Sequence, residues 1–330
     1  MKVTYINRSI NFGGFSFEEL FKTIKSNLKE IDYCDFYDKT YPRFLSNIKA
    51  VKKIPSDLYH ITGGVGYYAF FLPTNKTILT IHDTNHYEYD LKGIKKWIFG
   101  FLFYRLPINN VKYVTVVSEH TKSRLIELFG TPEQKIHVIH NCYSNNFKQD
   151  VKIDINSPTK ILQIGTKINK NLHRLINSVS GLNIELSIIG KLNKNLIDQL
   201  EKQGINYINK MNLSNTEIYN EYKNCDILAF ISLREGFGLP IIEANAVGRP
   251  VITSNISSMP EVAKNAACII DPTSEKEITE GMQKIIQDKA YRNQLITNGF
   301  ENIKRFNPTL IAKKYETLYS KMITENEREF

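Results

Sequence analysis

Two glutamates and two glycines stand close together in the segment Arg-Glu-Gly-Phe-Gly-Leu-Pro-Ile-Ile-Glu, residues 234–243. Gly236 and Gly238 allow the backbone to approach a ligand closely, because glycine has no Cβ atom. The carboxylates of Glu235 and Glu243 would repel a bare phosphate. We therefore expect the two carboxylates to bind hydroxyl groups, for example those of a sugar ring and a ribose.

The elements on either side of this segment indicate an anion site. An apolar, strand-like run at 227–231 precedes it and another at 251–253 follows it. Pro240 suits the first turn of a helix, and Gly248 followed by Pro250 suits its end. The unpaired N–H groups at the start of such a helix favour a phosphate. A lone Gly-x-Gly would more simply be a tight turn beside a solvated carboxylate, but the flanking strand, helix and proline favour binding.

Strand-like apolar runs alternate with helix-like stretches along the whole chain. The expected strands are 3–6, 58–61, 77–81, 113–117, 137–139, 160–164, 185–189, 227–231, 251–253 and 267–270. Continuous rather than alternating apolar character predicts strands covered on both faces, and the intervening helices predict parallel βαβ units. This is the doubly wound α/β class, and so many strands favour two sheets over one. The polar stretch 145–159 is the expected linker.

The overall composition suits a folded chain with an anionic partner. The 330 residues are 42% hydrophobic and carry a formal net charge of +9. The four cysteines are far apart, so we expect reduced core thiols and no metal cluster. The start of the chain lacks the apolar stretch of a signal peptide, and the apolar run at 97–104 is too short to span a bilayer. We therefore expect a cytoplasmic protein that at most rests on a membrane.

The spacing of Glu235 and Glu243 within Glu-Gly-Phe-Gly-Leu-Pro-Ile-Ile-Glu-Ala-Asn-Ala-Val-Gly-Arg-Pro-Val resembles the signature of the family 4 retaining glycosyltransferases, which have the GT-B fold. Further segments that resemble this family are 161–172, 218–226, 258–263 and 270–272. The resemblance implies two Rossmann-like domains that face each other across a cleft. Residues 1–150 would form the acceptor side, 151–306 would bind the nucleotide sugar, and the helix at 307–330 would cross back to the first domain.

The resemblance also implies roles for residues of the signature. Glu243 would hold the ribose hydroxyls of the donor nucleotide, and Glu235 would contact hydroxyls of the donor sugar. The backbone around Gly236, Phe237, Gly238 and Leu239 would receive the sugar and the β-phosphate.

A lysine after the strand at 160–164 is similar to the family's diphosphate-binding lysine. Lys170 would stabilise the negative charge of the departing nucleoside diphosphate, although taken alone it would be an ordinary exposed lysine. Many members carry an arginine immediately before this lysine, whereas this chain has Asn169, so Lys167 would supply the second positive charge.

Two regions of the first half resemble parts of the family's site. Gly13 and Gly14 follow the first strand, as the family's glycine-rich loop does, although glycine pairs after strands are common. His82 follows the strand at 77–81, and the resemblance implies contact with the transferred sugar; the alternative is a histidine that caps the strand end. His60 lies within a strand and is expected to be a core histidine with satisfied hydrogen bonds.

The expected activity is a retaining transfer of a hexose-type sugar from a UDP- or GDP-sugar to a glycan or glycolipid acceptor, in the synthesis of a bacterial surface polysaccharide. The catalytic residues implied are Glu235, Lys170 and His82, with no metal or other cofactor.

The first alternative is a phosphorylase or a nucleotide-sugar epimerase of the same fold. A nucleic-acid-binding protein is disfavoured because the basic residues are spread along the chain. A dehydrogenase is disfavoured because Gly63-Gly64-Val65-Gly66 lacks the required glycine spacing.

The segment 89–107 is basic in its first part and aromatic in its second. One interpretation is a helix that rests on an anionic membrane and favours a lipid-linked acceptor. The other is a helix that packs on the first sheet with its lysine side chains reaching out to water. The sequence leaves both open.

Overall fold

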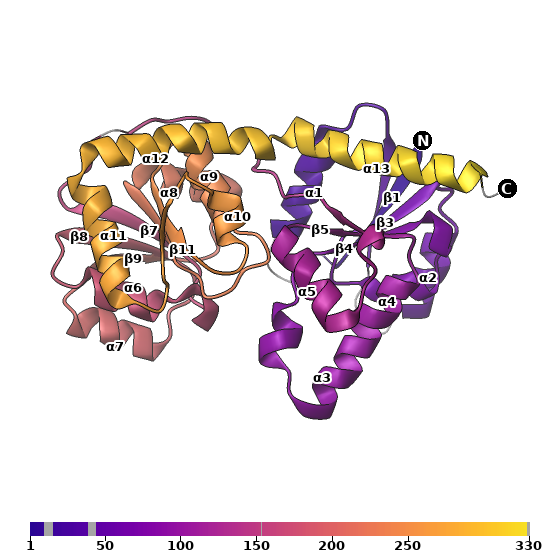
Figure 1. Ribbon diagram of the computed structural model, residues 1–330, viewed down its shortest axis with the longest axis horizontal. Coiled ribbons are helices and arrows are strands. Elements are labelled where there is room, and N and C mark those ends of the chain that lie inside the picture. Colours follow the sequence, from indigo (N-terminus) through magenta and orange to yellow (C-terminus); the bar gives the residue numbers. More distant parts are fainter. Residues whose placement is uncertain (10–15, 39–43, 153, 329–330) are drawn as a thin grey trace. The chain divides into compact units, whose positions relative to one another are not determined.

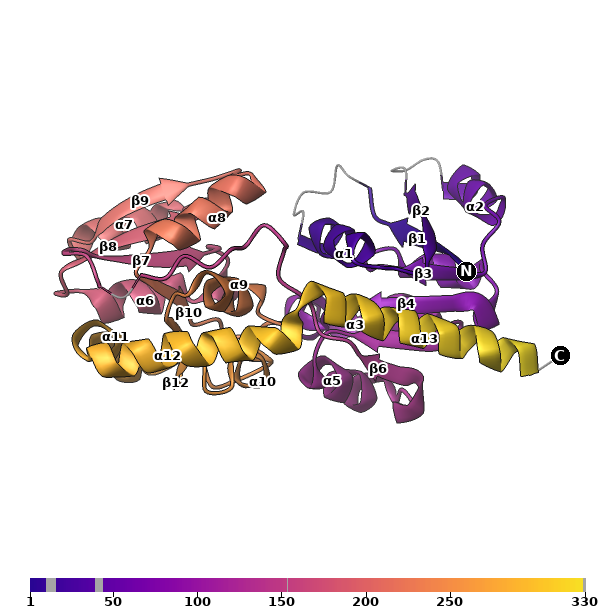
Figure 2. The same ribbon diagram turned by 90° about the horizontal axis from the view of Figure 1, so that it is seen from above.

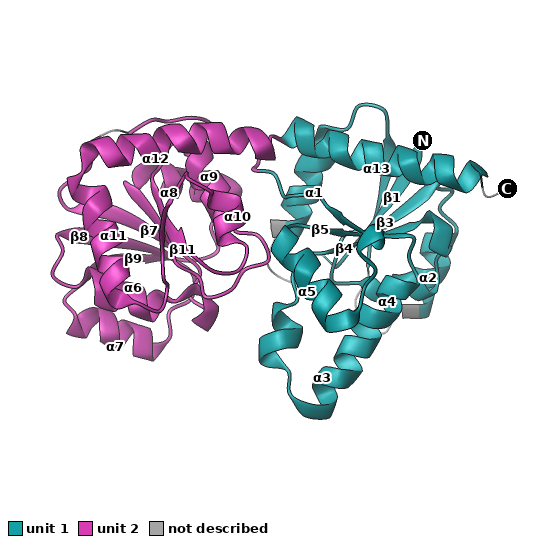
Figure 3. Ribbon diagram, viewed as in Figure 1, with its two compact units in different colours: residues 1–142, 308–330 teal, residues 143–307 magenta. Residues whose placement is uncertain are grey.

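The computed structural model describes residues 1–9, 16–38, 44–152 and 154–328. The chain forms two compact units, one of residues 1–142 with 308–330 and one of residues 143–307 (Figure 3). Each unit contains a six-stranded parallel sheet with helices on both faces, so the expected doubly wound α/β class is confirmed.

The sheet of unit 1 has the strand order β2-β1-β3-β4-β5-β6, and Figure 2 labels β2, β1, β3, β4 and β6. Its strands are β1 (Lys2–Asn7), β2 (Asp32–Tyr37), β3 (Leu58–Ile61), β4 (Thr77–Ile81), β5 (Tyr113–Val116) and β6 (Ile136–Val138). Alternate residues of each central strand enter two separate apolar clusters, because the strands are buried on both faces.

Helices α1 (Ser16–Ser26) and α13 (Pro308–Arg328) cover one face of this sheet (Figure 1). The other face is covered by α2 (Phe44–Lys52), α4 (Leu106–Asn109), α5 (Glu119–Phe129) and the short helix η2 (Gly66–Phe70). The remaining helical elements of the unit are α3 (Gly93–Gly100), the π-helical turns η4 (His86–Asp90) and η5 (Phe101–Arg105), and the 3-10 turns η3 (Thr74–Lys76) and η6 (Glu133–Lys135).

A buried hydrogen-bond network joins α13 to the sheet of unit 1. The Nδ1 atom of His60 lies 2.6 Å from the Tyr319 hydroxyl, and its Nε2 atom lies 2.6 Å from the Thr80 hydroxyl. The Tyr319 hydroxyl also lies 3.0 Å from that of Tyr5. His60 is fully buried with both ring nitrogens bonded, so its expected role as a satisfied core histidine is confirmed.

The sheet of unit 2 has the strand order β12-β11-β10-β7-β8-β9, and Figure 2 labels β12, β10, β7, β8 and β9. Its strands are β7 (Thr159–Ile164), β8 (Ile184–Ile189), β9 (Asn206–Lys210), β10 (Ile227–Phe230), β11 (Val251–Ser254) and β12 (Cys268–Ile270). Its helices are α6 (Leu172–Val179), α7 (Lys194–Lys202), α8 (Asn215–Asn224), α9 (Leu239–Val247), α10 (Met259–Ala263), α11 (Glu275–Gln287) and α12 (Lys289–Asn302), with the 3-10 turns η7 (Ile168–Lys170) and η8 (Ile303–Phe306).

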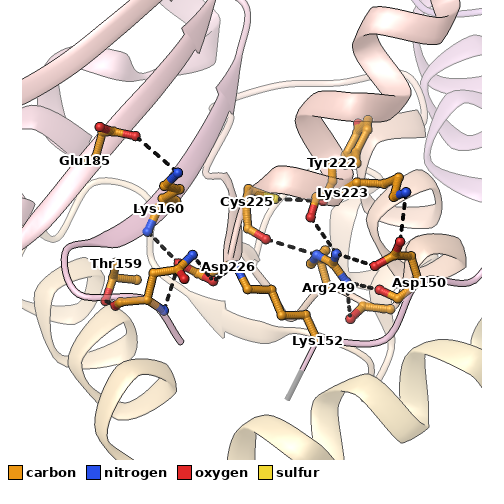
Figure 4. Close-up of polar contacts among 12 residues, drawn as sticks. Asp150, Lys152, Thr159, Lys160, Glu185, Tyr222, Lys223, Cys225, Asp226 and Arg249 are labelled. Atoms are coloured by element: carbon orange, nitrogen blue, oxygen red, sulfur yellow. Dashed lines mark hydrogen bonds and ion pairs between the residues drawn. The ribbon is translucent and has the colours of Figure 1, made fainter. Parts of the chain in front are cut away.

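A buried arginine fixes the segment that leads into unit 2 (Figure 4). Arg249 is 1% exposed and donates hydrogen bonds to the carbonyl of Cys225, at 3.0 Å, and to the carboxylate of Asp150, at 3.3 Å. The carboxylate of Asp226, which is also buried, pairs with the ammonium of Lys152 at 2.6 Å. The stretch expected as a linker is therefore bonded to the segments that connect α8 to β10 and α9 to β11 in unit 2.

The two edge strands β2 and β9 were not expected from the sequence. In both strands polar residues interrupt the apolar ones and every residue is exposed or half-buried, so neither has the continuous apolar run that marks the central strands. The ten expected strands are all present, with ends that differ by at most one residue.

Candidate functional site

The carboxyl end of β10 leads through a short loop into α9, where the sequence places its anion site. Gly238 precedes the helix with a φ of 109°, in the left-handed region that favours glycine. Pro240 lies in the first turn, as expected, and no side chain caps the N-terminus. Gly248, with a φ of 88°, ends the helix. The first turn of α9 thus carries backbone N–H groups that the helix itself cannot pair.

Two of the residues expected to act together are in direct contact beside this helix start. The ammonium Nζ of Lys170 lies 2.6 Å from the carboxylate Oε1 of Glu235. The side chains are 21% and 16% exposed, so the pair is partly buried but open to a solute. The Lys170 ammonium also lies 5.1 Å from the centre of the Phe230 ring. A positive and a negative group therefore stand together at the carboxyl end of the sheet.

Gln163 stabilises the turn that carries Lys170 by hydrogen bonds, and Gly165 leaves space for the Lys170 side chain. The Gln163 side-chain amide donates hydrogen bonds to the carbonyls of Gly165 and Lys170, each at 3.2 Å. Gly165 has a φ of 89°, and a Cβ atom there would lie 2.9 Å from the Lys170 side chain. Glycine at position 165 therefore leaves the space in which the aliphatic part of the Lys170 side chain packs, so that its ammonium group contacts Glu235.

Asn169, which replaces the arginine found in many similar proteins, contacts the loop after β10. Its side-chain amide donates to the Arg234 carbonyl at 3.3 Å, and its own carbonyl accepts from the Leu233 N–H at 2.7 Å. Asn169 therefore joins the lysine turn to the glutamate loop. Lys167, the expected second cation, is exposed at the start of the same turn.

Two serines after β11 hold the backbone of the glutamate loop. The Ser257 hydroxyl accepts a hydrogen bond from the Glu235 N–H at 3.1 Å and donates one to the Glu235 carbonyl at 2.7 Å. The Ser258 hydroxyl lies 2.8 Å from the carbonyl of Phe237 and 3.0 Å from that of Glu235. Ser257 has a φ of 60°, which is uncommon for a residue with a side chain. Backbone strain and hydrogen bonds thus combine at the residue that positions Glu235.

Glu243 lies in the second turn of α9 and faces α8. The Tyr222 hydroxyl donates to its carboxylate Oε2 at 2.6 Å. Burial raises the pKa of Glu243 to about 7, although the tyrosine hydrogen bond acts in the opposite direction. The side chain keeps some solvent exposure. It can accept hydrogen bonds from hydroxyl groups when ionised, and at neutral pH its ionisation is close to its midpoint.

His82, which directly follows β4 in unit 1, is 8% exposed and lies against Phe17 with ring centres 3.8 Å apart. Its Nε2 atom lies 2.8 Å from the Thr62 carbonyl, which can only accept, so Nε2 carries the proton. Burial lowers the pKa of His82 to about 4, so the ring is neutral at pH 7. Its Nδ1 atom is then an acceptor, and among the described residues it has no hydrogen-bond partner.

A close contact with the chain fixes the position of this ring. A Cβ atom at Gly63, whose φ is 123°, would lie 2.8 Å from the His82 ring. The hydrogen bond from Nε2 to the Thr62 carbonyl, directly after β3, is the contact expected of a histidine that bonds to a strand end. Contact with a sugar through Nδ1 stays a prediction. Gly13 and Gly14, the expected glycine-rich loop, lie outside the described residues.

The residues that sequence reasoning missed act by contact across elements. These residues are Tyr222, Ser257 and Ser258. Their partners lie at least 21 positions away in the chain, so a local sequence pattern could not predict the contacts. Gln163 had a weaker signal, as a polar residue within an apolar strand. Among the described residues, no three His, Cys, Asp or Glu side chains gather as potential metal ligands.

The arrangement has a definite chemical preference. A lysine and unpaired helix amides suit the phosphates of a ligand, while two carboxylates suit hydroxyl groups on either side of them. Phosphate and hydroxyl groups occur together in a nucleotide sugar.

Comparison with family models and curated proteins gives consistent matches. Residues 146–302 match the model described as glycosyl transferases group 1, and residues 32–145 match glycosyltransferase family 4. The chain is 27% identical to the O-antigen chain mannosyltransferase RfbU of Salmonella typhimurium, over 70% of this chain and 67% of the relative. It is 26% identical to the capsular polysaccharide biosynthesis glycosyltransferase CapM of Staphylococcus aureus, over 72% of this chain and 68% of the relative.

Solved structures show the same fold over nearly the full length. Sucrose-phosphate synthase from Thermosynechococcus elongatus has a TM-score of 0.80 at 15% identity, covering 98% of this chain and 100% of the other. Anabaena HepE in complex with UDP and glucose has a TM-score of 0.78 at 17% identity, covering 97% and 100%.

Proposed function

This chain is a glycosyltransferase of family 4 with the GT-B fold, and we propose that it transfers a hexose-type sugar from a UDP- or GDP-sugar with retention of anomeric configuration. The observation that carries this proposal is the contact between Lys170 and Glu235 beside the uncapped start of α9. Glu243 lies one turn further along the same helix.

In the proposed complex the donor enters between the two members of the ion pair. The Lys170 ammonium moves from the Glu235 carboxylate to the diphosphate, and the amides around Gly238 and Leu239 face the β-phosphate and sugar. Glu235 is then released to accept hydrogen bonds from the sugar hydroxyls, and Glu243 from the ribose hydroxyls. The pair keeps both side chains near these positions in the free protein, which limits the entropy cost of donor binding.

His82 would contribute a hydrogen bond to the transferred sugar. Its neutral Nδ1 atom can accept a proton from a sugar hydroxyl, while the Nε2 proton remains on the Thr62 carbonyl. This role uses the ring nitrogen of His82 that has no hydrogen-bond partner among the described residues.

The transfer itself exchanges one bond for another on the same face of the sugar. The acceptor oxygen bonds to the anomeric carbon as the bond from that carbon to the β-phosphate oxygen breaks. The acceptor proton passes to the departing phosphate, which takes the electron pair. Lys170 stabilises the growing negative charge, so the protein contributes position and electrostatics rather than a nucleophile or a metal ion.

We further propose a glycan or lipid-linked glycan as acceptor and a role in bacterial surface polysaccharide synthesis, in the cytoplasm or at the inner face of the membrane. The names of the relatives RfbU and CapM, which refer to O-antigen and capsule, support this assignment. The crystal complex of HepE with UDP and glucose supports a nucleotide-sugar donor.

A thermal-shift panel of UDP, GDP, ADP and their hexose conjugates tests the donor. One nucleoside diphosphate and its sugar should raise the melting temperature, with and without EDTA. The product's anomeric configuration, measured by NMR, should equal that of the donor. Stabilisation by none of the nucleotides, or an inverted product, would overturn the proposal. Sugar phosphate formed from free phosphate, or an epimerised nucleotide sugar, would instead indicate a phosphorylase or an epimerase.

A further inference from the structure

Helix α3 and the turn η5 of unit 1 carry an apolar stripe that no part of the described chain covers. Its members follow the helical spacing i, i+3, i+4, i+7 and i+8, which in a globular protein normally faces the core. These side chains are 75%, 67%, 43%, 38% and 43% exposed and belong to Ile94, Trp97, Ile98, Phe101 and Leu102. We call these five residues the exposed stripe.

The opposite side of this helical segment holds it to the rest of unit 1. Gly100 is buried beside Tyr87, where a Cβ atom would lie 2.5 Å from the tyrosine ring. Tyr104 stacks on Phe129 of α5 with ring centres 4.7 Å apart. The interpretation of a helix that packs its apolar face on the sheet is therefore wrong for the exposed stripe. Figure 1 shows α3 extending away from the sheet of unit 1.

The most exposed aromatic residue of the stripe is held in a defined orientation. The rings of Trp97 and Phe101 are parallel within 2°, with centres 5.7 Å apart. Tryptophan is enriched at membrane interfaces, where its ring reaches the apolar boundary while its N–H group remains near water.

The charges around the stripe have a single sign. Residues 91–105 contain no Asp or Glu, and their four basic residues are Lys92, Lys95, Lys96 and Arg105. Just before this segment, Glu88 pairs with Arg124, whereas Asp90 is 52% exposed beside His86. An apolar face whose own segment carries only basic charges is complementary to an anionic lipid surface.

We propose that the exposed stripe and its basic neighbours dock unit 1 on the surface of an anionic phospholipid bilayer. Association with a second copy of this chain would bring two sets of like charges together, which disfavours that occupant. No helix in the described part of the chain is long and apolar enough to span a membrane, so the contact is peripheral. The proposal does not depend on the identity of the sugar donor.

Trp97 is the single tryptophan of the chain, so its fluorescence reports on the stripe directly. The full chain is mixed with vesicles of phosphatidylcholine, alone or with about 30% phosphatidylglycerol. Anionic vesicles should shift the emission to shorter wavelength, protect it from acrylamide and sediment the protein. Raising the salt concentration should weaken the sedimentation, because charges near the surface are screened.

Two variants separate the contributions of the stripe and the lysines. Trp97→Ala with Phe101→Ala should reduce vesicle partitioning about tenfold or more, because the buried apolar area is lost. Lys92→Gln with Lys95→Gln should reduce it about fivefold per lysine on anionic vesicles. The matched control, Leu45→Ala with Ile126→Ala, removes exposed apolar side chains of unit 1 outside the stripe and should leave partitioning unchanged. Circular dichroism and melting temperature verify that each variant is folded.

Three results would overturn the proposal. The first is unchanged Trp97 emission without sedimentation on either vesicle. The second is equal binding to zwitterionic and anionic vesicles. The third is a blue shift that rises with protein concentration in the absence of vesicles, together with a dimer in sedimentation velocity, which would identify a second copy as the occupant.

Discussion

Lys170 and Glu235 neutralise each other at the place where the phosphates of the proposed donor would enter. Lys170→Ala removes the cation expected to stabilise the departing diphosphate, and we predict a fall in kcat of about 10²–10³. The protein should remain folded, because the loss of one partly buried ion pair costs less than the roughly 5–15 kcal/mol that stabilises a typical domain. Initial rates of donor hydrolysis or transfer measure the effect.

A surface lysine provides the control for this variant. Lys276 is 84% exposed and pairs with Glu280 on its own helix, so Lys276→Ala should leave the rate unchanged. Lys167→Ala should lower the rate less than Lys170→Ala, because Lys167 is exposed. A Lys170→Ala protein with wild-type kcat would refute the assigned role.

Glu243 shows a conflict between function and stability. Its pKa of about 7 means that folding disfavours the carboxylate, since an unfolded glutamate ionises near pH 4.5. The unfolded chain therefore loses its proton first, and this group makes the folded state less stable as pH rises from about 4.5 to 7. Glu243→Gln should raise the free energy of unfolding at pH 8 by about 2–3 kcal/mol, and the difference should vanish below about pH 5.

Nucleotide binding should change in the opposite sense in this variant. The neutral amide can still accept the Tyr222 hydrogen bond, but it binds a ribose diol less well than a carboxylate does. Urea unfolding at several pH values and titration with the stabilising nucleoside diphosphate measure the two effects, with Glu280→Gln on the surface as control. A destabilised Glu243→Gln protein at pH 8 would contradict the inference.

The loop between β10 and α9 depends on a neighbouring loop for its shape. Ser257 combines a φ of 60° with two hydrogen bonds to the Glu235 backbone. Ser257→Gly suits the backbone angle but removes the hydroxyl, so Glu235 should lose its fixed position. We predict a fall in kcat of about tenfold, because small displacements of positioned groups are costly in rate.

The nucleoside diphosphate affinity of this variant separates positioning from general damage. Glu243 lies on α9 and does not bond to Ser257, so the dissociation constant of the nucleotide should stay within about twofold of wild type. Ser257→Asn, which tolerates this backbone angle and carries a donor and an acceptor on its side chain, should recover part of the rate. Equal losses of rate and nucleotide affinity in Ser257→Gly would indicate a merely structural role.

The sequence predicted elements well where their signal was local. The central strands are apolar on both faces, and Pro240 and Gly248 bound α9 as expected. The edge strands β2 and β9 mix polar with apolar residues and are exposed or half-buried throughout, so their pairing depends on a neighbouring strand rather than on their own composition. Their position could therefore not be read from the sequence.

For the site, the sequence indicated Glu235, Glu243 and Lys170 through their spacing and their resemblance to the family. It could not show that Lys170 contacts Glu235 directly, or that Asn169 joins the two loops, because these contacts arise when β7 and β10 become neighbours. The hydrogen bonds of the two serines depend in the same way on β11.

Acid should change the folding stability of the two units to different extents, because their shifted pKa values differ in direction. In unit 1, burial lowers the pKa of His60 to about 3 and that of His82 to about 4, so the unfolded chain takes up protons first as the pH falls below about 6.5. Unit 1 should therefore lose up to about 2.7 kcal/mol per pH unit in that range. In unit 2, the raised pKa of Glu243 makes the folded state more stable as the pH falls toward about 4.5. The lowered pKa of His173 makes the folded state less stable as the pH falls, so the two effects oppose each other.

Acidification from pH 7 to 5.5 should accordingly lower the melting temperature of unit 1 more than that of unit 2. Differential scanning calorimetry measures the transitions, and limited proteolysis with mass spectrometry assigns each transition to a unit. In Glu243→Gln, unit 2 should itself become more sensitive to acid, because the opposing effect is gone. Equal shifts of both units in the wild type would contradict this expectation.

The place of α13 in unit 1 has a consequence for biosynthesis. Tyr315, Tyr319 and Met322 complete the apolar cluster against β1 and α1, yet the ribosome makes them only after all of residues 143–307. Because domains fold as their residues become available, unit 2 can finish folding while unit 1, although translated first, still exposes the sheet face that α13 covers. The nascent chain would therefore need α13, or a chaperone in its place, to protect the exposed sheet face of unit 1.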